Sequence, residues 1–223
     1  MTARGPLIED PKLLFEIIRR LSAAGFAADD IAWSENCGPP KNAEDFAREA
    51  IFVICNSGMR ATVAVGIFEK CMRAIDVNAS AHTAFGHKGK TAAIDTIWRD
   101  RDRLFAGYLA AEDKIAYCRS LPWIGGITCY HLAKNFGAQV AKPDVHLVRL
   151  AERHGTNPQL LCEQLSTTSG YKVNTVDLIL WRACAERILD GRTAALVEPI
   201  IPEPIPPIQI QLFQPTQEEL FPT

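Results

Sequence analysis

Apolar residues recur at helical spacing through almost all of residues 1–197. One early stretch shows this clearly, because its apolar residues are Leu13, Leu14, Ile17, Ile18 and Leu21. Patterns of this kind predict helices over about residues 11–24, 42–56, 61–75, 90–100, 102–109, 111–120, 127–136, 145–154, 156–166 and 174–189. No convincing alternation of apolar and polar residues predicts a strand. The chain is therefore expected to be all-α.

The size and charge of the chain set broad limits on its class. With 223 residues, 48% of them hydrophobic, it is long enough for one substantial core or for two small lobes that share a groove. Its formal net charge is −2, but residues 198–223 contain four glutamates and no lysine or arginine. Residues 1–197 therefore carry 24 − 22 = +2, a balance that permits DNA binding without requiring it.

Neither a membrane span nor a secretory signal is expected. No run of 18 apolar residues occurs, and no apolar segment follows Arg4 near the N-terminus. The seven cysteines contain no CxxC pair and lie mostly within apolar helical patterns, which is typical of reduced core thiols. The last two, Cys162 and Cys184, are 22 residues apart, so the close four-cysteine cluster of an iron–sulfur centre is missing. We expect a cytoplasmic protein without such a cluster.

A glycine turn interrupts two helical patterns in LPWIGGITC, residues 121–129. Gly125 and Gly126 break the helix, and the pattern resumes at Ile127. Backbone N–H groups at the start of the second helix, aided by the helix dipole, would bind a phosphate without a cationic side chain. The same spacing also fits an ordinary corner between two helices.

Asp144 follows this turn in KPDVHLVR, residues 142–149. Aspartate is a favoured N-cap, so its simplest role is to begin the next helix. The alternative role is chemical. A carboxylate held close to a phosphate-binding hairpin would stabilise the oxocarbenium character that develops when an N-glycosidic bond breaks, and it would orient a water.

These two motifs, in this order and at this spacing, resemble the helix-hairpin-helix and Gly/Pro-Asp pattern of the endonuclease III and 8-oxoguanine glycosylase superfamily of DNA glycosylases. Upstream, IFVICNSGMRATVAVGIFEKCMRAI resembles the helix, polar break and helix that line the base pocket of that family. The resemblance covers about residues 43–190. It implies a two-lobed helical fold with the DNA-binding hairpin and the active site at the groove between the lobes, and an enzyme that flips a base out of duplex DNA and hydrolyses its N-glycosidic bond.

The resemblance also implies roles for individual residues. Asp144 matches the catalytic aspartate. The positions that contact DNA are Gly125, Ile127, Thr128, Trp123, Arg60 and Lys134, and those that match the base pocket are Asn56, Ser57 and Met59. The backbone carbonyls of Arg119, Leu121 and Ile124 match those that hold a monovalent cation, K⁺ or Na⁺, and no other cofactor is expected.

Two departures from the family pattern matter. Ile127 stands where bifunctional members carry the lysine that attacks C1′, so we expect a monofunctional enzyme that leaves an abasic site. Lys134 and Lys142 are the alternative amines, although Lys134 is expected to contact solvent or phosphate. Trp123 replaces the usual glycine at the hairpin tip, where its ring either packs locally, which we favour, or reaches toward DNA.

The composition changes sharply at Glu198. Residues 198–223 hold seven of the fourteen prolines, which favours an extended tail outside the helical domain of residues 1–197. This tail contains QxxLF twice, with Gln209, Leu212 and Phe213 in the first copy and Gln217, Leu220 and Phe221 in the second. Each copy resembles the pentapeptide that binds the bacterial sliding clamp. The alternative is a strap that folds back over the helical body.

Three functions remain open from the sequence alone. The leading one is a DNA glycosylase that acts on duplex DNA in base excision repair, as a monomer in the nucleoid of a bacterial cytoplasm. The second is an antiphage glycosylase that excises a hypermodified phage base by the same chemistry. The third is a non-catalytic DNA-binding module in which Asp144 serves only as a cap.

Overall fold

The chain forms an all-helical structure in the computed structural model, which describes residues 6–10 and 12–198. Within these residues there is no strand, and the only β-type pairing is an isolated bridge between Leu189 and Leu196. The α-helices are α1 (Pro6–Glu9), α2 (Lys12–Ala23), α3 (Ala28–Asn36), α4 (Ala43–Asn56), α5 (Ala61–Asp76), α6 (Lys88–Arg99), α7 (Arg101–Ala110), α8 (Lys114–Ser120), α9 (Thr128–Asn135), α10 (Val145–Arg153), α11 (Pro158–Ser169) and α12 (Val173–Ala185), with a 3₁₀ turn at Ala81–Thr83. The all-α prediction is therefore confirmed.

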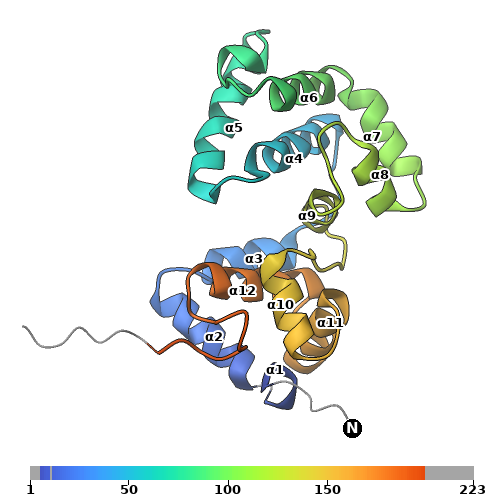
Figure 1. Cartoon of the computed structure of the whole chain (residues 1–223). Coiled ribbons are helices and arrows are strands. Elements are labelled where there is room, and N and C mark those ends of the chain that lie inside the picture. The colour runs from blue at the N-terminus through green and yellow to red at the C-terminus, as the bar shows by residue number, and fades with distance from the viewer. Residues whose placement is uncertain (1–5, 11, 199–223) are drawn as a thin grey trace, which may run out of the picture.

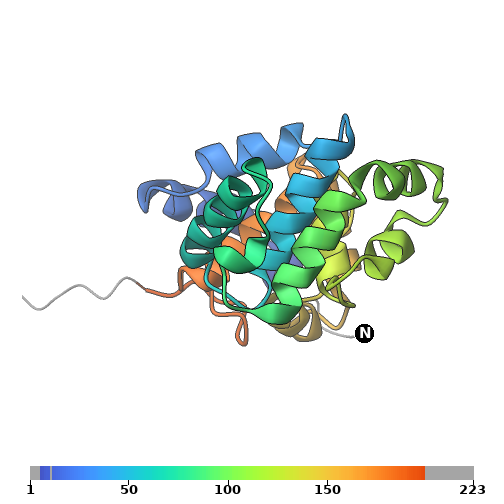
Figure 2. The same cartoon turned by 90° about the horizontal axis from the view of Figure 1, so that it is seen from above.

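The helices fall into two groups, and each group has its own hydrophobic core (Figure 1). The central helix group contains α4 to α9, and the terminal helix group contains α1 to α3 with α10 to α12. In the view from above, the central group overlies the terminal group (Figure 2). Within the described residues, none of the helices is both long and apolar enough to cross a membrane.

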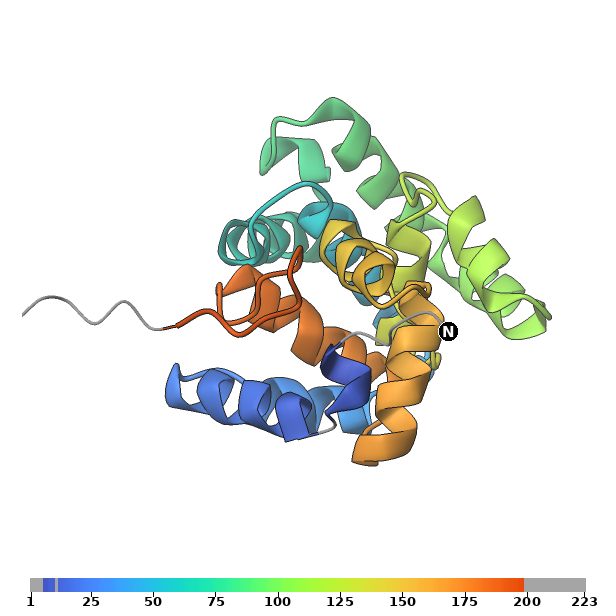
Figure 3. The ribbon, with the colours of Figure 1, turned by 60° about the horizontal axis from the view of Figure 1, so that its bottom comes forward.

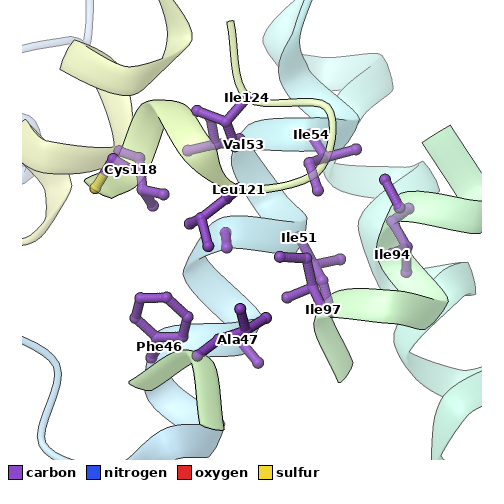
Figure 4. Close-up of a cluster of buried hydrophobic side chains, with 14 of the residues drawn as sticks. Phe46, Ala47, Ile51, Val53, Ile54, Ile94, Ile97, Cys118, Leu121 and Ile124 are labelled. Carbon is purple, nitrogen blue, oxygen red and sulfur yellow. The ribbon is translucent and has the colours of Figure 1, made fainter. Parts of the chain in front are cut away.

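α4 is the axis of the central helix group. Its first turn is capped by Asn42, whose side chain accepts a hydrogen bond from the Asp45 N–H at 2.8 Å. Nearly every residue on its inner face is fully buried, and the helix packs against α5, α6, α7 and α9. Figure 4 shows how side chains of α4 meet those of α6 and of the segment around Leu121. This burial holds the predicted hairpin against the central core.

The terminal helix group is assembled from both ends of the described chain. α2 and α3 pack against α12, and α1 packs against α11 (Figure 3). The Leu7 N–H donates to His154 Nε2 at 3.1 Å, and the Arg20 guanidinium donates to the Val197 carbonyl at 2.9 Å. The chain therefore passes between the two groups twice, once between α3 and α4 and once between α9 and α10.

α3 is the one helix of eight or more residues that the sequence patterns do not predict. Ala27 stands at its N-cap with a φ of +94°, and no side chain caps the first turn. Ser34 is its only fully buried residue, so the apolar stripe that marks the other helices is absent here. Packing on α12 stabilises this helix without a strong local signal.

Gly137 ends α9 in a conformation that only glycine adopts at little cost. Its φ is +84°, and a Cβ atom there would lie 2.8 Å from the Gly38 Cα. We expect Gly137→Ala to lower the free energy of unfolding by about 2 kcal/mol or more, because left-handed strain and a clash with fixed backbone act together. Chemical denaturation of the two proteins measures the difference.

Gly66 provides the matched control for this substitution. It lies inside α5, and apart from its chain neighbours and the backbone of its own helix no atom would lie within 4 Å of an added Cβ. Alanine there should raise the free energy of unfolding by about 0.5–1 kcal/mol, since it restricts the unfolded chain. Equal effects of the two substitutions would contradict the argument.

Candidate functional site

The hairpin of residues 121–127 joins α8 to α9, at the place where the sequence predicts a glycine turn between two helices. α8 begins at an Asp113 cap, and Leu121 and Ile124 bury the turn against the central core. The Gly125 N–H donates to Thr128 Oγ1 at 2.7 Å, so this amide is already occupied. The N–H groups of Gly126, Ile127 and Thr128 have no acceptor among the described residues. Three consecutive amides at the start of α9 are therefore available to an anion.

Trp123 lies at the tip of this hairpin in a left-handed conformation, with a φ of +64°. A glycine would adopt this backbone more easily than a tryptophan does. The Trp123 ring packs edge-on against His87, with 5.1 Å between ring centroids. A Cβ on Gly89 would lie 2.4 Å from the same ring. The side chain packs locally, as expected, yet 46% of it stays exposed.

A pocket of about 620 Å³ is lined by residues of α4, α5 and α9 from the central helix group and of α3 and α12 from the terminal helix group. Its apolar wall carries Phe52, Phe68, Trp33 and Trp181. The rings of Phe52 and Phe68 meet edge to face, with 5.7 Å between their centroids. Its polar wall carries Asp45, Arg48, Glu49, Asn56, His131, Lys134, Asn135, Lys142, Asp177 and Arg182. Aromatic walls with a few converging polar groups are typical of a small-molecule site.

A buried ion pair forms part of the pocket wall. Lys134 on α9 pairs with Asp177 on α12, and both side chains are almost fully buried. The second oxygen of Asp177 accepts the Lys142 N–H at 2.7 Å. The expectation that Lys134 contacts solvent or phosphate is therefore wrong, because burial and the pairing with Asp177 occupy its amine.

Asp144 is the N-cap of α10, as its sequence context predicts. Its Oδ1 accepts hydrogen bonds from the N–H groups of His146 at 3.0 Å and Leu147 at 3.2 Å. Its Oδ2 lies 3.8 Å from Lys142 Nζ, and its side chain is 14% exposed. Asp144 does not itself line the pocket, but Lys142 does. The carboxylate therefore lies beside a lysine that lines the pocket.

Burial changes the proton affinity of several groups in the pocket wall. It lowers the pKa of His131 well below its ordinary value, an effect to which the charges of Lys142 and Lys134 add. It raises the pKa of Glu49, although a hydrogen bond from Asn135 at 2.6 Å opposes the shift. Burial also raises the pKa of Asp177, against the opposing charge of Lys134. His131 is therefore neutral at physiological pH.

The residues expected in the base pocket are only partly brought together. Asn56, at the end of α4, lines the pocket, whereas Ser57 and Met59 do not. The Ser57 carbonyl instead accepts a hydrogen bond from the buried Lys90 amine at 2.6 Å, which caps the end of α4. Arg60 is exposed at the start of α5, also outside the pocket wall.

Two expected sites remain, the cation site at the hairpin carbonyls and the QxxLF motifs of the tail. The Leu121 carbonyl accepts the Ile124 N–H at 3.1 Å. The cation site expected at the carbonyls of Arg119, Leu121 and Ile124 stays a prediction. In the part of the chain that the structure describes, no group of three His, Cys, Asp or Glu side chains could hold a metal ion. The QxxLF residues, from Gln209 to Phe221, lie outside the described residues.

Several pocket residues carry no role in the sequence interpretation. Asp177 is the clearest case, although a lone aspartate between Val176 and Ile179 on an apolar helix face is itself a signal of a buried polar site. Trp33 lies on α3, the helix that the sequence patterns do not predict. Nothing local marks Phe52 or Phe68, because aromatic residues at helical spacing are usually core residues.

Comparison with known proteins adds no further assignment. No protein-family model, curated protein or solved structure matches the chain.

The Lys134–Asp177 pair should be costly to break from one side. Asp177→Asn leaves a buried ammonium without its counter-ion, so we expect the free energy of unfolding to fall by about 3–5 kcal/mol. The double substitution Lys134→Met with Asp177→Leu should cost less than the sum of the two single changes. Arg73→Ala breaks the exposed Arg73–Glu69 pair and should cost at most about 0.5 kcal/mol. Additive costs for the buried pair would contradict the assignment.

The lowered pKa of His131 predicts a pH dependence of stability. The unfolded chain takes up a proton below about pH 6.5, whereas the folded chain does not, so the free energy of unfolding falls as pH falls from 7 to 5. This group contributes at most about 1.4 kcal/mol per pH unit and no slope above pH 7. His131→Gln should remove this part of the slope, whereas substitution of the exposed His82 by glutamine should keep it.

Proposed function

We propose that this protein is a helix-hairpin-helix DNA glycosylase, which excises a base from duplex DNA by hydrolysis of its N-glycosidic bond. One observation carries the proposal. A single segment, residues 121–145, joins a hairpin with three available amides, a helix that lines the pocket, and a fixed carboxylate next to that pocket. In the proposed reaction the hairpin binds the DNA backbone, the pocket binds the base and the carboxylate assists bond cleavage.

The hairpin would bind the DNA backbone. The free N–H groups of Gly126, Ile127 and Thr128 suit a phosphate oxygen, as does the positive end of the α9 dipole. Lys88, next to the Trp123 contact, and Arg119, at the end of α8, are exposed cations on the adjoining elements. Contacts of this kind position DNA without reading its sequence.

The pocket would receive the flipped base. Phe52, Phe68, Trp33 and Trp181 supply apolar and aromatic surface against which a base stacks, and Asn56 and Asn135 supply amide groups for its polar edge. The volume of about 620 Å³ is in the range of sites for drug-sized ligands. Both damaged and enlarged, hypermodified bases therefore belong among the substrates to test.

Asp144 would supply the chemistry. Bond cleavage develops positive charge on the sugar, and an ionised carboxylate nearby stabilises that charge and orients the attacking water. The two backbone N–H donors that hold Oδ1 leave Oδ2 available for this role. Ile127 provides no amine at the hairpin, so base release itself is hydrolytic and yields an abasic site.

Asp144→Asn is the decisive substitution for this proposal. It keeps an oxygen for the helix cap but removes the negative charge, so we expect base release to fall by about 100-fold or more while duplex binding persists. The assay is a panel of duplexes, each with one damaged or hypermodified base, scored for alkali-labile sites. Wild-type activity on a hypermodified base alone would favour an antiphage role over general repair.

Asp113→Asn is a matched control, because Asp113 caps α8 with bonds of 3.0 and 2.9 Å from the N–H groups of Ile115 and Ala116. It should leave base release nearly unchanged. Undiminished release by the Asp144 variant would overturn the catalytic role. Duplex binding by the wild type without release of any base would instead support a non-catalytic DNA-binding module.

A role for the QxxLF motifs remains part of the proposal. Truncation before Gln209 should abolish capture by a bacterial sliding clamp if the motifs bind it, and it should leave base release intact because the helical body holds the proposed site. Unchanged capture after truncation would exclude the motifs as clamp ligands.

A further inference from the structure

Lys142 is a pocket amine for which hydrolytic base release provides no role. Its side chain is 22% exposed and lines the same pocket as His131 and Lys134. The Lys134 amine is bound by Asp177, whereas Lys142 Nζ has no hydrogen-bond partner among the described residues. Its nearest carboxylate oxygen is Asp144 Oδ2 at 3.8 Å, which is longer than a hydrogen bond. The Lys142 amine is therefore the accessible one of the two.

The backbone on either side of Lys142 is fixed by three hydrogen bonds. The Ala141 N–H donates to Gln159 Oε1 at 2.8 Å, and the Lys142 N–H donates to Asp177 Oδ1 at 2.7 Å. The Asp144 N–H donates to the Lys142 carbonyl at 2.8 Å. These bonds fix the backbone that carries Lys142, whose side chain lines the pocket, and Asp144, whose carboxylate lies beside it, independently of the charge on the amine.

The surroundings of Lys142 also favour the reactive form of its amine. Burial lowers the pKa of Lys142, and the neighbouring Lys134 acts in the same direction, while Asp144 and Asp177 oppose the change. Only a neutral amine attacks a carbonyl carbon. Lys142 therefore presents more of the nucleophilic form near neutral pH than an exposed lysine does.

We propose that Lys142 gives the protein a second activity, the cleavage of DNA at abasic sites through a Schiff base. This proposal rests on the proposed function for the DNA substrate, but not for the identity of the excised base. It assigns strand cleavage to an amine on the Asp144 side of the pocket instead of the hairpin, where Ile127 stands. The proposal differs from the expectation, based on Ile127, of an enzyme that releases the base without cleaving the strand.

The reaction balances with the groups at hand. The Lys142 nitrogen adds to the C1′ aldehyde of the ring-opened abasic sugar, and loss of one water gives a protonated imine. Removal of a C2′ proton then supplies the electron pair that breaks the C3′–O bond, and the 3′ phosphate leaves. Asp144, 3.8 Å from Nζ, is placed to accept and return protons during these steps. Water finally hydrolyses the imine and regenerates the amine.

Borohydride trapping on a preformed abasic duplex tests the proposal directly. Sodium borohydride reduces the imine to a stable amine, so the full-length wild-type protein should give a covalent protein–DNA adduct. Digestion and mass spectrometry should then locate the adduct on Lys142. Because this readout uses the wild-type protein, it does not depend on whether any variant folds.

Two variants sharpen the test. Lys142→Ala and Lys142→Arg should both reduce trapping and strand cleavage to the level of the no-enzyme control, since the guanidinium keeps the charge but is not a nucleophile. Lys70→Ala, at an exposed position of α5, should trap as the wild type does. For the wild type, trapping should reach half its maximum at a pH below 10.5, the ordinary pKa of lysine.

The outcomes separate this proposal from the glycosylase itself. Base release by the wild type without any trapped adduct would overturn the role of Lys142 and leave the glycosylase intact. An adduct mapped to another lysine or to the N-terminal amine would also overturn it. A Lys142 adduct on abasic DNA, without release of any base, would support the lyase and count against the glycosylase.

Discussion

The buried ion pair between Lys134 and Asp177 is the interaction on which the arrangement of the two helix groups depends. Lys134 lies on α9 of the central helix group and Asp177 on α12 of the terminal helix group, and burial makes either charge unfavourable without the other. Asp177 also binds the backbone of Lys142, so the same carboxylate fixes the connection that leads to Asp144. The two helix groups that line the pocket are therefore connected by a specific ion pair, in addition to their apolar contacts.

α9 connects the proposed phosphate-binding turn to the pocket. Its N-terminus offers free amides to a phosphate, and its later residues, His131, Lys134 and Asn135, form part of the pocket wall. In the proposed complex, a helix of fixed length would set the distance between the bound DNA backbone and the reacting sugar. The bound phosphate and the excised base would then be positioned by one rigid element.

Much of the fold and some of the site follow from local sequence signals. α4 and α10 are predicted closely because Asn42 and Asp144 cap them and apolar stripes run along them. α3 is missed because its stability comes from packing on α12, which no local pattern records. Asn56 is foreseen in the pocket, but Asp177 and Lys142 acquire their roles only when distant segments meet. Lys134 is misassigned for the same reason, since exposure is a tertiary property.

The contact between Trp123 and Gly89 has a consequence for variation at these positions. The ring occupies the space that a Cβ at position 89 would need, so any larger residue there requires the Trp123 ring to move from its contact with His87. Replacement of Trp123 by a small residue would release that restriction. Among orthologous chains we therefore expect residues larger than glycine at position 89 mainly where position 123 carries a small residue.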